Sequence, residues 1–312
     1  MRSYHRLPPG AMAVILGPSR RDETMGKYRI SAAFCLLAGV AGALWAQGGP
    51  APIERKPAGP PFRIADNLYH VGASDSAVYL IAGRDGLILL DGGFPEDAEG
   101  VLANVRALGF DPKNIRLLLI SQAHQDHGGG LAAIKAATGA RLLASREDSA
   151  LLERGGLKDP QFGDSLPFPP VRVDRFVADR ERVTLGDVTL TAHLTPGHTP
   201  GCTTWSMKVR DGATSRDALF VCGATAPGYR LIGNDAYPDA VGDFEMSFAR
   251  WRGLKCELFL GAHGSYFGLE RKRGLIRKGR VNPFVDPAGC RGFLARAEKA
   301  LRAQVARERA AR

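Results

Sequence analysis

Histidine and aspartate side chains directly follow predicted strands in this 312-residue chain, and this pattern constrains the fold more than any other feature. His124, Asp126 and His127 come after the apolar segment 115–120, which has the composition of a buried strand. His198 and His263 each come after a further predicted strand. Because loops at the ends of neighbouring strands meet at one edge of a sheet, we expect these five groups to gather there.

The rest of the chain alternates predicted strands and helices. Apolar segments predict strands over 87–90, 115–120 and 140–144, and helical spacing predicts helices over 95–108, 131–138 and 146–154. The second half repeats the theme with a hairpin over 182–195, strands over 203–209, 218–222 and 257–260, and a helix over 239–251. We therefore expect an α+β fold in which two mixed β-sheets are flanked by helices, as a four-layer αβ/βα sandwich.

The grouping of the histidines predicts a metal site. Any one histidine is usually an ordinary polar residue, but four of the seven in this chain fall in glycine-rich loops at the predicted edge. Imidazoles with a carboxylate form the ligand set that zinc prefers in catalytic sites, where an open position is left for water. A hydrolytic zinc centre is the chemistry that this pattern indicates.

The N-terminus has the pattern of an export signal. Lys27 and Arg29 precede an apolar run over 30–45 that is short for a membrane span and ends in small residues. We expect residues 1–24 to be an upstream extension, 25–46 a signal peptide, 47–61 a flexible leader and 62–312 the folded domain. These expectations imply a periplasmic or secreted protein with no stable membrane insertion after the signal is removed.

Composition and charge exclude several classes of protein. With 45% apolar and 24% charged residues, the chain is neither disordered nor a disulfide-dense miniprotein. Most of the net charge of +10 lies after Glu270, where apolar residues recur at helical spacing over 291–312. We interpret this basic tail as the solvated face of an amphipathic helix, with a surface for a polyanion or membrane as the alternative, and we expect no nucleic-acid partner.

The cysteines leave several arrangements open. Cys202, Cys222, Cys256 and Cys290 lie outside the predicted signal, and four cysteines permit three pairings. A disulfide between Cys256 and Cys290 would close a loop of about 35 residues. Cys202 and Cys222 lie near the predicted metal loops, where they could be buried packing residues, a mutual disulfide or soft metal ligands.

Several further stretches give the chain a resemblance to a known family. They are 89–93, 130–140, 195–205, 226–231, 237–239 and 243–244, in addition to the segment 121–130. With these, the chain resembles the metallo-β-lactamase superfamily over nearly all of the expected domain, and more closely the third subclass (B3) of its β-lactam-hydrolysing enzymes. The fold that this resemblance implies is the same four-layer sandwich.

The resemblance also implies two zinc positions and a disulfide. The first position matches Gln122, His124 and His198, and the second matches Asp126, His127 and His263. Members of the family usually have a histidine where Gln122 stands, and an amide oxygen is the weaker donor to zinc. We therefore expect zinc to fill the second position first, with the first position weakly held or empty. Relatives of this subclass also form the disulfide that corresponds to Cys256 and Cys290.

The implied function is an exported zinc-dependent hydrolase that opens the amide bond of β-lactam antibiotics with a metal-activated water, with Asp126 as the catalytic carboxylate. A second departure lies at Gly223, where relatives commonly carry a serine that orients water or substrate. Thr225 keeps a neighbouring hydroxyl, and we expect it, with Tyr229, to bind the substrate. The alternatives are a metallo-hydrolase of the same fold that acts on a thioester, lactone or phosphoester, and a catalytically degenerate binding relative. Asp91 is expected to be structural and to bond backbone donors beneath the metal loops.

Overall fold

The computed structural model describes residues 59–73, 75–276 and 281–312. The expected upstream extension, the signal peptide and most of the leader lie outside the described residues. Within the described part, no helix is both long enough and apolar enough to cross a membrane.

The first sheet is built from the N-terminal half of the described chain. Its seven strands pair in sequence order, from β1 at one edge to β7 at the other. The strands β1 to β4 are antiparallel neighbours, whereas β4 to β7 run parallel to one another. The strands are β1 (Phe62–Ala65), β2 (Leu68–His70), β3 (Tyr79–Gly83), β4 (Gly86–Leu90), β5 (Ile115–Leu119), β6 (Arg141–Ser145) and β7 (Arg175–Val177).

The second sheet is built from the C-terminal half and has the order β12-β11-β10-β9-β8. Only the β11–β12 pair is parallel, so both sheets are mixed as the sequence predicted. The strands are β8 (Arg182–Leu185), β9 (Val188–Leu194), β10 (Thr203–Asp211), β11 (Thr214–Val221) and β12 (Leu258–Gly261).

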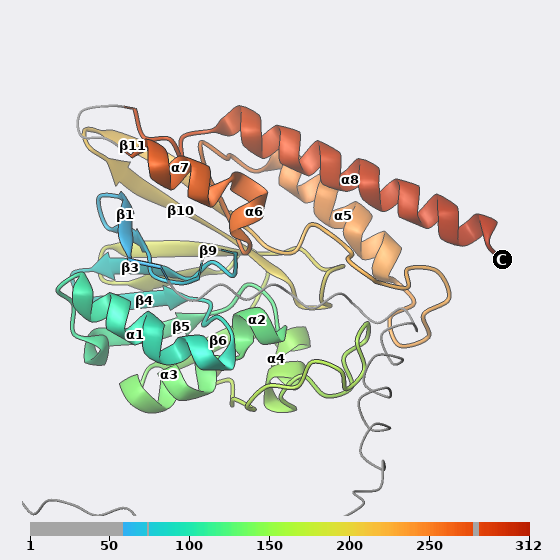
Figure 1. The fold of residues 1–312 in the computed structure, drawn as a ribbon, viewed down its shortest axis with the longest axis horizontal. Coiled ribbons are helices and arrows are strands. Elements are labelled where there is room, and N and C mark those ends of the chain that lie inside the picture. Colours follow the sequence, from blue (N-terminus) through green and yellow to red (C-terminus); the bar gives the residue numbers. More distant parts are fainter. Residues whose placement is uncertain (1–58, 74, 277–280) are drawn as a thin grey trace, which may run out of the picture. The chain divides into compact units, whose positions relative to one another are not determined.

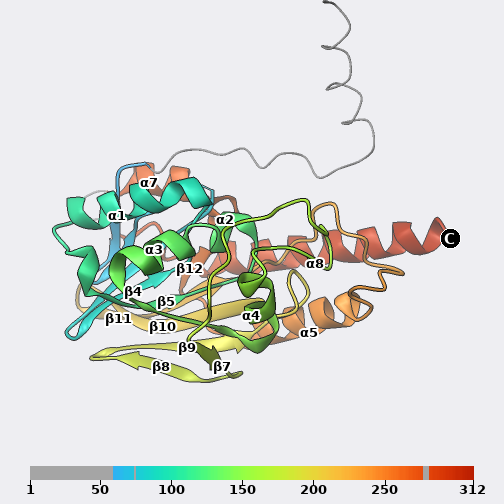
Figure 2. The ribbon, with the colours of Figure 1, turned by 90° about the horizontal axis from the view of Figure 1, so that it is seen from below.

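Helices cover the outer faces of both sheets, which confirms the predicted four-layer sandwich (Figures 1 and 2). The first sheet carries α1 (Ala98–Ala107), α2 (Gln125–Gly128), α3 (Leu131–Thr138) and α4 (Arg146–Glu153). The second carries α5 (Ala240–Gly253), α6 (Gly264–Phe267), α7 (Leu269–Leu275) and α8 (Pro287–Ala310). Short 3₁₀ turns lie at Pro95–Asp97 and Pro112–Asn114.

Strand β4 shows how the sequence makes two cores. Its residues alternate between the two faces of the sheet because successive side chains of a strand point in opposite directions. Leu87 and Leu89 pack with the helices on the outer face, and Ile88 and Leu90 pack in the core between the sheets. A strand buried on both faces is apolar throughout, which is why the short run over 87–90 was recognisable from sequence.

The structure adds elements that the sequence analysis did not predict. The edge strand β7 and the helices α6 and α7 are short, and the hydrophobic periodicity of such short elements is weak. Helix α8 begins at Pro287, four residues before the predicted start. The missed signal was Asp286, whose side chain accepts a hydrogen bond from Gly289 N at 2.8 Å and caps the helix.

Candidate metal centre

The loops after β5, β9 and β12 meet at one edge of the sandwich and bring the predicted ligands together. Asp126, His127 and His263 form one cluster of facing ligand atoms. His127 Nε2 lies 3.2 Å from Asp126 Oδ2 and 3.3 Å from His263 Nε2, and the third side, His263 Nε2 to Asp126 Oδ2, is 3.7 Å. A point about 2.0 Å from all three atoms exists inside this triangle, which is the bond length of zinc to such ligands. These residues therefore fit a divalent metal.

The other two histidines form a second pair of facing nitrogens. His124 Nδ1 lies 3.2 Å from His198 Nε2, with both side chains buried. Two nitrogens bound tetrahedrally to one metal at about 2.05 Å would lie about 3.3 Å apart. His198 donates its other ring proton, from Nδ1, to the carbonyl of Thr225 at 2.7 Å, which leaves Nε2 free to bind a metal.

Gln122 is buried beside this pair. Together with His124 and His198, it lines the cavity above the candidate ligands. Its Oε1 faces the two sulfur atoms, at 3.4 Å from Cys222 Sγ and 3.9 Å from Cys202 Sγ. Its Nε2 has no hydrogen-bond partner among the described residues. Because an amide can be rotated to exchange its oxygen and nitrogen, the opposite orientation would turn the oxygen into the position that now holds the unpaired nitrogen.

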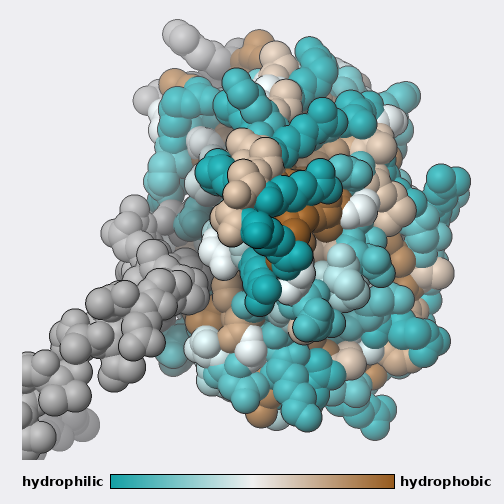
Figure 3. Space-filling view, turned by 90° about the vertical axis from the view of Figure 1, so that its right-hand side faces the viewer, coloured by the Kyte–Doolittle hydropathy of each residue, from teal (hydrophilic) through white to brown (hydrophobic). Residues whose placement is uncertain are grey.

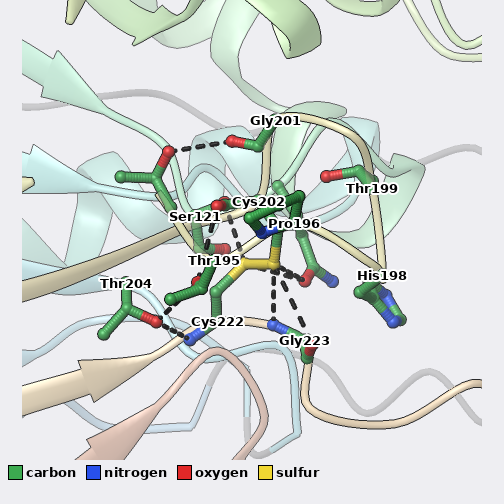
Figure 4. Close-up of a disulfide and its surroundings, with 12 residues drawn as sticks. Ser121, Thr195, Pro196, His198, Thr199, Gly201, Cys202, Thr204, Cys222 and Gly223 are labelled. Atoms are coloured by element: carbon green, nitrogen blue, oxygen red, sulfur yellow. Dashed lines mark hydrogen bonds between the residues drawn. A yellow bond between two sulfur atoms is a disulfide. The ribbon is translucent and has the colours of Figure 1, made fainter. Parts of the chain in front are cut away.

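Both cysteine pairs are disulfides. Cys202 and Cys222 are bonded to each other (Figure 4), which selects the mutual disulfide among the three arrangements left open by the sequence. Gly223 N donates to Cys202 Sγ at 3.2 Å, so the disulfide supports the segment next to His198. The disulfide between Cys256 and Cys290, which the resemblance implied, is present and joins the segment before β12 to α8.

A carboxylate lies behind three of the four histidines. His127 Nδ1 is 3.3 Å from Asp91, His124 Nε2 is 3.2 Å from Asp159 and His263 Nδ1 is 3.3 Å from Asp75. The N–H groups of His127 and His124 are not directed straight at the carboxylate oxygen. Such partners orient an imidazole and raise its basicity toward a metal. Asp75 and Asp159 could not be recognised from the sequence, because neither has a motif around it.

Asp91 also has the structural role that the sequence predicted. Its carboxylate accepts hydrogen bonds from Ser121 N and Ser121 Oγ, both at 2.7 Å, directly below the metal loop. The residue has a φ of +66°, in the left-handed region that few residues other than glycine adopt. Such backbone strain persists only where surrounding contacts hold it, and here the two bonds to Ser121 and the contact with His127 do so.

The electrostatics of the cluster favour ionised carboxylates. Burial by itself would raise the pKa of Asp126, but His127 and His263 face it and hold that pKa well below its usual range. Burial lowers the pKa of His198, and the neighbouring His124 lowers it further, so this imidazole is neutral at physiological pH. The hydrogen bond from His263 lowers the pKa of Asp75 to about 2. For His198 and for Asp126, these are the protonation states in which the groups bind metals.

Asp148, at the first turn of α4, ties two metal loops together and was also missed. Its carboxylate accepts from Ala123 N, beside His124, at 2.9 Å. It also accepts from Thr199 Oγ1 and Gly201 N, beyond His198, both at 2.9 Å.

The two expected substrate residues occupy different places. Thr225 lines the cavity, with its hydroxyl 3.3 Å from that of Tyr266. Tyr229 does not line it, which corrects the expectation: its buried hydroxyl donates to the carbonyl of His198 at 2.9 Å, and its ring lies against the His198 ring. Tyr229 therefore supports a ligand from behind, whereas Tyr266 is a cavity residue that the sequence analysis did not identify.

A cavity of about 240 Å³ opens above the ligands. Its apolar wall is Phe162, Leu166 and Pro227, and its hydroxyl wall is Ser265, Thr225 and Tyr266. No lysine or arginine is among the described residues that line it. The cavity therefore offers an anionic substrate hydroxyl groups rather than a cationic side chain.

Comparison with known proteins agrees with this geometry. Among solved structures, the chain is similar to BJP-1, a subclass B3 metallo-beta-lactamase of Bradyrhizobium japonicum, with 41% identity, a TM-score of 0.78, and coverage of 82% of this chain and 97% of that chain. It is also similar to native FEZ-1 metallo-beta-lactamase from Legionella gormanii, with 38% identity, a TM-score of 0.80, and coverage of 82% and 99%.

A match to curated proteins is shorter. A hydroxyacylglutathione hydrolase of Anaeromyxobacter dehalogenans is 33% identical over 151 residues, which is 48% of this chain and 48% of that protein. The chain thus spans about half the length of this relative. The family described as the metallo-beta-lactamase superfamily matches residues 71–263, which hold all the ligands discussed above. This chain therefore belongs to the metallo-beta-lactamase superfamily, and its structural neighbours include BJP-1, a subclass B3 enzyme.

Proposed function

We propose that this protein is an exported zinc-dependent hydrolase that opens the amide bond of β-lactams. The observation that carries the proposal is the triangle of Asp126, His127 and His263, whose sides fit one zinc ion at the edge of the cavity. The substrate class rests on the similarity to BJP-1 and FEZ-1, both named metallo-beta-lactamases, over four fifths of this chain.

Zinc is the metal we propose because two imidazoles and one carboxylate are a common ligand set of its catalytic sites. Zinc bound there would act as a Lewis acid and lower the pKa of a water molecule. We propose that the Asp126, His127 and His263 position binds more tightly than the position of Gln122, His124 and His198, since the latter offers an amide in place of a third imidazole.

Within this site, the chain's own residues hold and orient the reactants. The lowered pKa of Asp126 makes it a weak proton acceptor, so its role is to ligate and to orient a water molecule through its second oxygen. The hydroxyls of Thr225 and Tyr266 are placed to bind the carboxylate of a bicyclic β-lactam. Phe162 and Leu166 provide apolar contacts for the substrate ring system.

The experiment is an assay of purified protein with nitrocefin, followed by a penicillin, a cephalosporin and a carbapenem. Turnover should disappear with a chelator and return with zinc. His263→Ala should remove turnover, because it removes one of the three ligands of this position. His193→Ala is the matched control: this histidine is half-buried on β9, bonds Ser206 Oγ at 2.8 Å and lies outside the cluster.

The same assay separates the alternatives. A hydroxyacylglutathione thioester is the competing substrate, because the curated relative is named a hydroxyacylglutathione hydrolase. Zinc-dependent thioester cleavage without β-lactam opening would establish that alternative. A protein that binds zinc and hydrolyses neither substrate would be a degenerate binding relative.

Zinc titration of the apoprotein tests the order of the two positions. We expect one tight equivalent, lost in His263→Ala and kept in His198→Ala, followed by a weaker one. Two tight equivalents that are both required for turnover would contradict this order.

Export and processing are tested by expressing the full chain in a bacterium and sequencing the mature N-terminus. We propose that the signal ends at Ala46 and that the mature protein is periplasmic or secreted. Recovery of an unprocessed chain in the cytoplasm would contradict this.

A further inference from the structure

The C-terminal end of α8 lies beside a loop that reaches the metal centre (Figures 1 and 2). Glu308 Oε2 accepts hydrogen bonds from the backbone N–H groups of Leu231 and Ile232, at 2.7 and 2.8 Å. Gln304 donates to the carbonyl of Tyr229 at 2.8 Å and to Glu308 Oε1 at 3.0 Å. Two helix residues thus bond three backbone groups of this loop, at Tyr229, Leu231 and Ile232.

Glu308 is unusual at this position. The last turns of a helix carry partial negative charge, so a carboxylate there is unfavourable and cations are preferred. The last turn of α8 holds Arg307 and Arg309, as expected. Glu308 is nevertheless half-buried and directed at two N–H groups of the loop, one of which belongs to the buried Leu231. The bonds to the loop, rather than helix stability, account for this carboxylate.

The loop held in this way contacts both histidines of the first metal position through a closed ring of aromatic contacts. Tyr229 lies 5.3 Å from His198 and 5.3 Å from Phe162, measured between ring centroids. Phe162 lies 5.3 Å from His124, and His124 lies 4.8 Å from His198. A shift of Tyr229 therefore moves the packing surface of both imidazoles.

A second connection runs through Asn234. Its Nδ2 donates to the carbonyl of Pro160 at 2.8 Å, which ties the loop to the segment that carries Asp159. Asp159 faces His124 Nε2 at 3.2 Å. Figure 3 views the side of the molecule on which α8 ends, where hydrophilic residues surround and partly cover a hydrophobic centre.

We propose that Glu308 and Gln304 are positioning residues for His124 and His198: the end of α8 fixes the loop over 229–234, and that loop fixes the two imidazoles. The inference rests on the proposed function only in treating these histidines as metal ligands.

In the position that they form, Gln122 replaces the usual histidine. This position therefore depends more on contacts that hold its two imidazoles in place than the Asp126, His127 and His263 position does.

The test uses the full-length apoprotein with ¹⁵N-labelled histidine, and compares Glu308→Ala with the native chain. The ring signals of His124 and His198 should shift or broaden, while those of His127 and His263 stay unchanged as an internal control. Backbone amide exchange should accelerate about tenfold over 229–234, because this loop loses its bonds to Glu308, and also over 159–163, because Asn234 ties that segment to the loop. In cobalt titrations of the same variant, the weaker equivalent should bind about tenfold less tightly.

Two variants separate positioning from general damage. Glu298→Ala is the matched control, since Glu298 is on the same helix and its carboxylate binds Arg252 at 2.8 Å and Arg302 instead of the loop. It should leave the four ring signals unchanged. Glu308→Gln keeps an oxygen that can accept both N–H groups and should restore most of the native spectrum.

Unchanged His124 and His198 signals in a folded Glu308→Ala protein would overturn the proposal, and so would equal changes in all four histidines. If Glu308→Ala does not unfold cooperatively, the measurement is made on Gln304→Ala, which removes the bond to the Tyr229 carbonyl. The ring signals of His124 and His198 should again change while those of His127 and His263 do not. These spectra need neither zinc nor a β-lactam, so a failure of the proposed hydrolase activity would not affect them.

Discussion

Replacing Asp148 should test whether one buried carboxylate holds the metal loops. The side chain is almost fully buried, and its two oxygens satisfy Ala123 N, Thr199 Oγ1 and Gly201 N, each at 2.9 Å. An unpaired buried donor costs about 1–3 kcal/mol. Asp148→Ala leaves three such donors, so we expect a loss of about 3–9 kcal/mol in the free energy of unfolding.

Asp148→Asn is the finer perturbation because it keeps the volume of the side chain. One amide oxygen can still accept from Ala123 N and Thr199 Oγ1, whereas the NH₂ group would face Gly201 N as one donor against another. This variant should lose about 1–3 kcal/mol. It should also bind zinc more weakly, since both loops carry ligands.

The assay is urea unfolding of the apoproteins at pH 7.5. Burial raises the pKa of Asp148 to about 6, while Thr199 lowers it, so the native carboxylate is ionised at this pH. Glu147→Gln is the control, since Glu147 is the exposed neighbour in the same turn of α4. If Asp148→Asn and Asp148→Ala are both within about 0.5 kcal/mol of the native protein, as ordinary surface changes are, the reasoning is refuted.

Three further predictions concern separate parts of the molecule. Gly223→Ser should displace the His198 ring by about 1 Å, because an added Cβ would lie 2.1 Å from His198 Cγ. Zinc titration should then show weaker binding of the second equivalent, whereas Gly242→Ser, where an added Cβ meets open space, should leave zinc binding unchanged. Burial and Arg273 lower the pKa of His70 to about 3, so only the unfolded chain takes up this proton between pH 6.5 and 3. Between pH 6.5 and pH 5, the free energy of unfolding of the native protein should therefore fall by about 2 kcal/mol more than that of His70→Phe. An equal dependence on pH in the two proteins would contradict this. Cys256→Ala removes a disulfide whose cysteines are 34 residues apart. In urea unfolding, the free energy of unfolding of the oxidised native protein should exceed that of this variant by about 4 kcal/mol.

Much of the fold could be predicted because its signals are local. Strand β4 is apolar on both faces, and α1 is followed by Gly109 at a φ of +86°, the left-handed conformation that ends helices. The candidate ligands were identified for the same reason. Each follows a strand directly, so the pattern of elements along the chain also gives the edge of the sheet at which they lie.

The partners of those ligands could not be predicted in this way. Asp75 and Asp159 reach His263 and His124 across 188 and 35 residues of sequence, and each stands in a loop where an aspartate is ordinary. Tyr229 was expected to bind the substrate, whereas packing places its hydroxyl against the backbone carbonyl of His198.

The sequence by itself therefore determined the longer strands and helices and the identities of the candidate ligands, since residue type and spacing along one segment suffice for these. Only the tertiary structure decided the Cys202–Cys222 disulfide, the carboxylates behind the histidines and the bonds from Glu308 to the loop. These contacts depend on placing distant segments within about 3 Å of one another, and that placement comes from the packing of two sheets and their helices rather than from any local pattern.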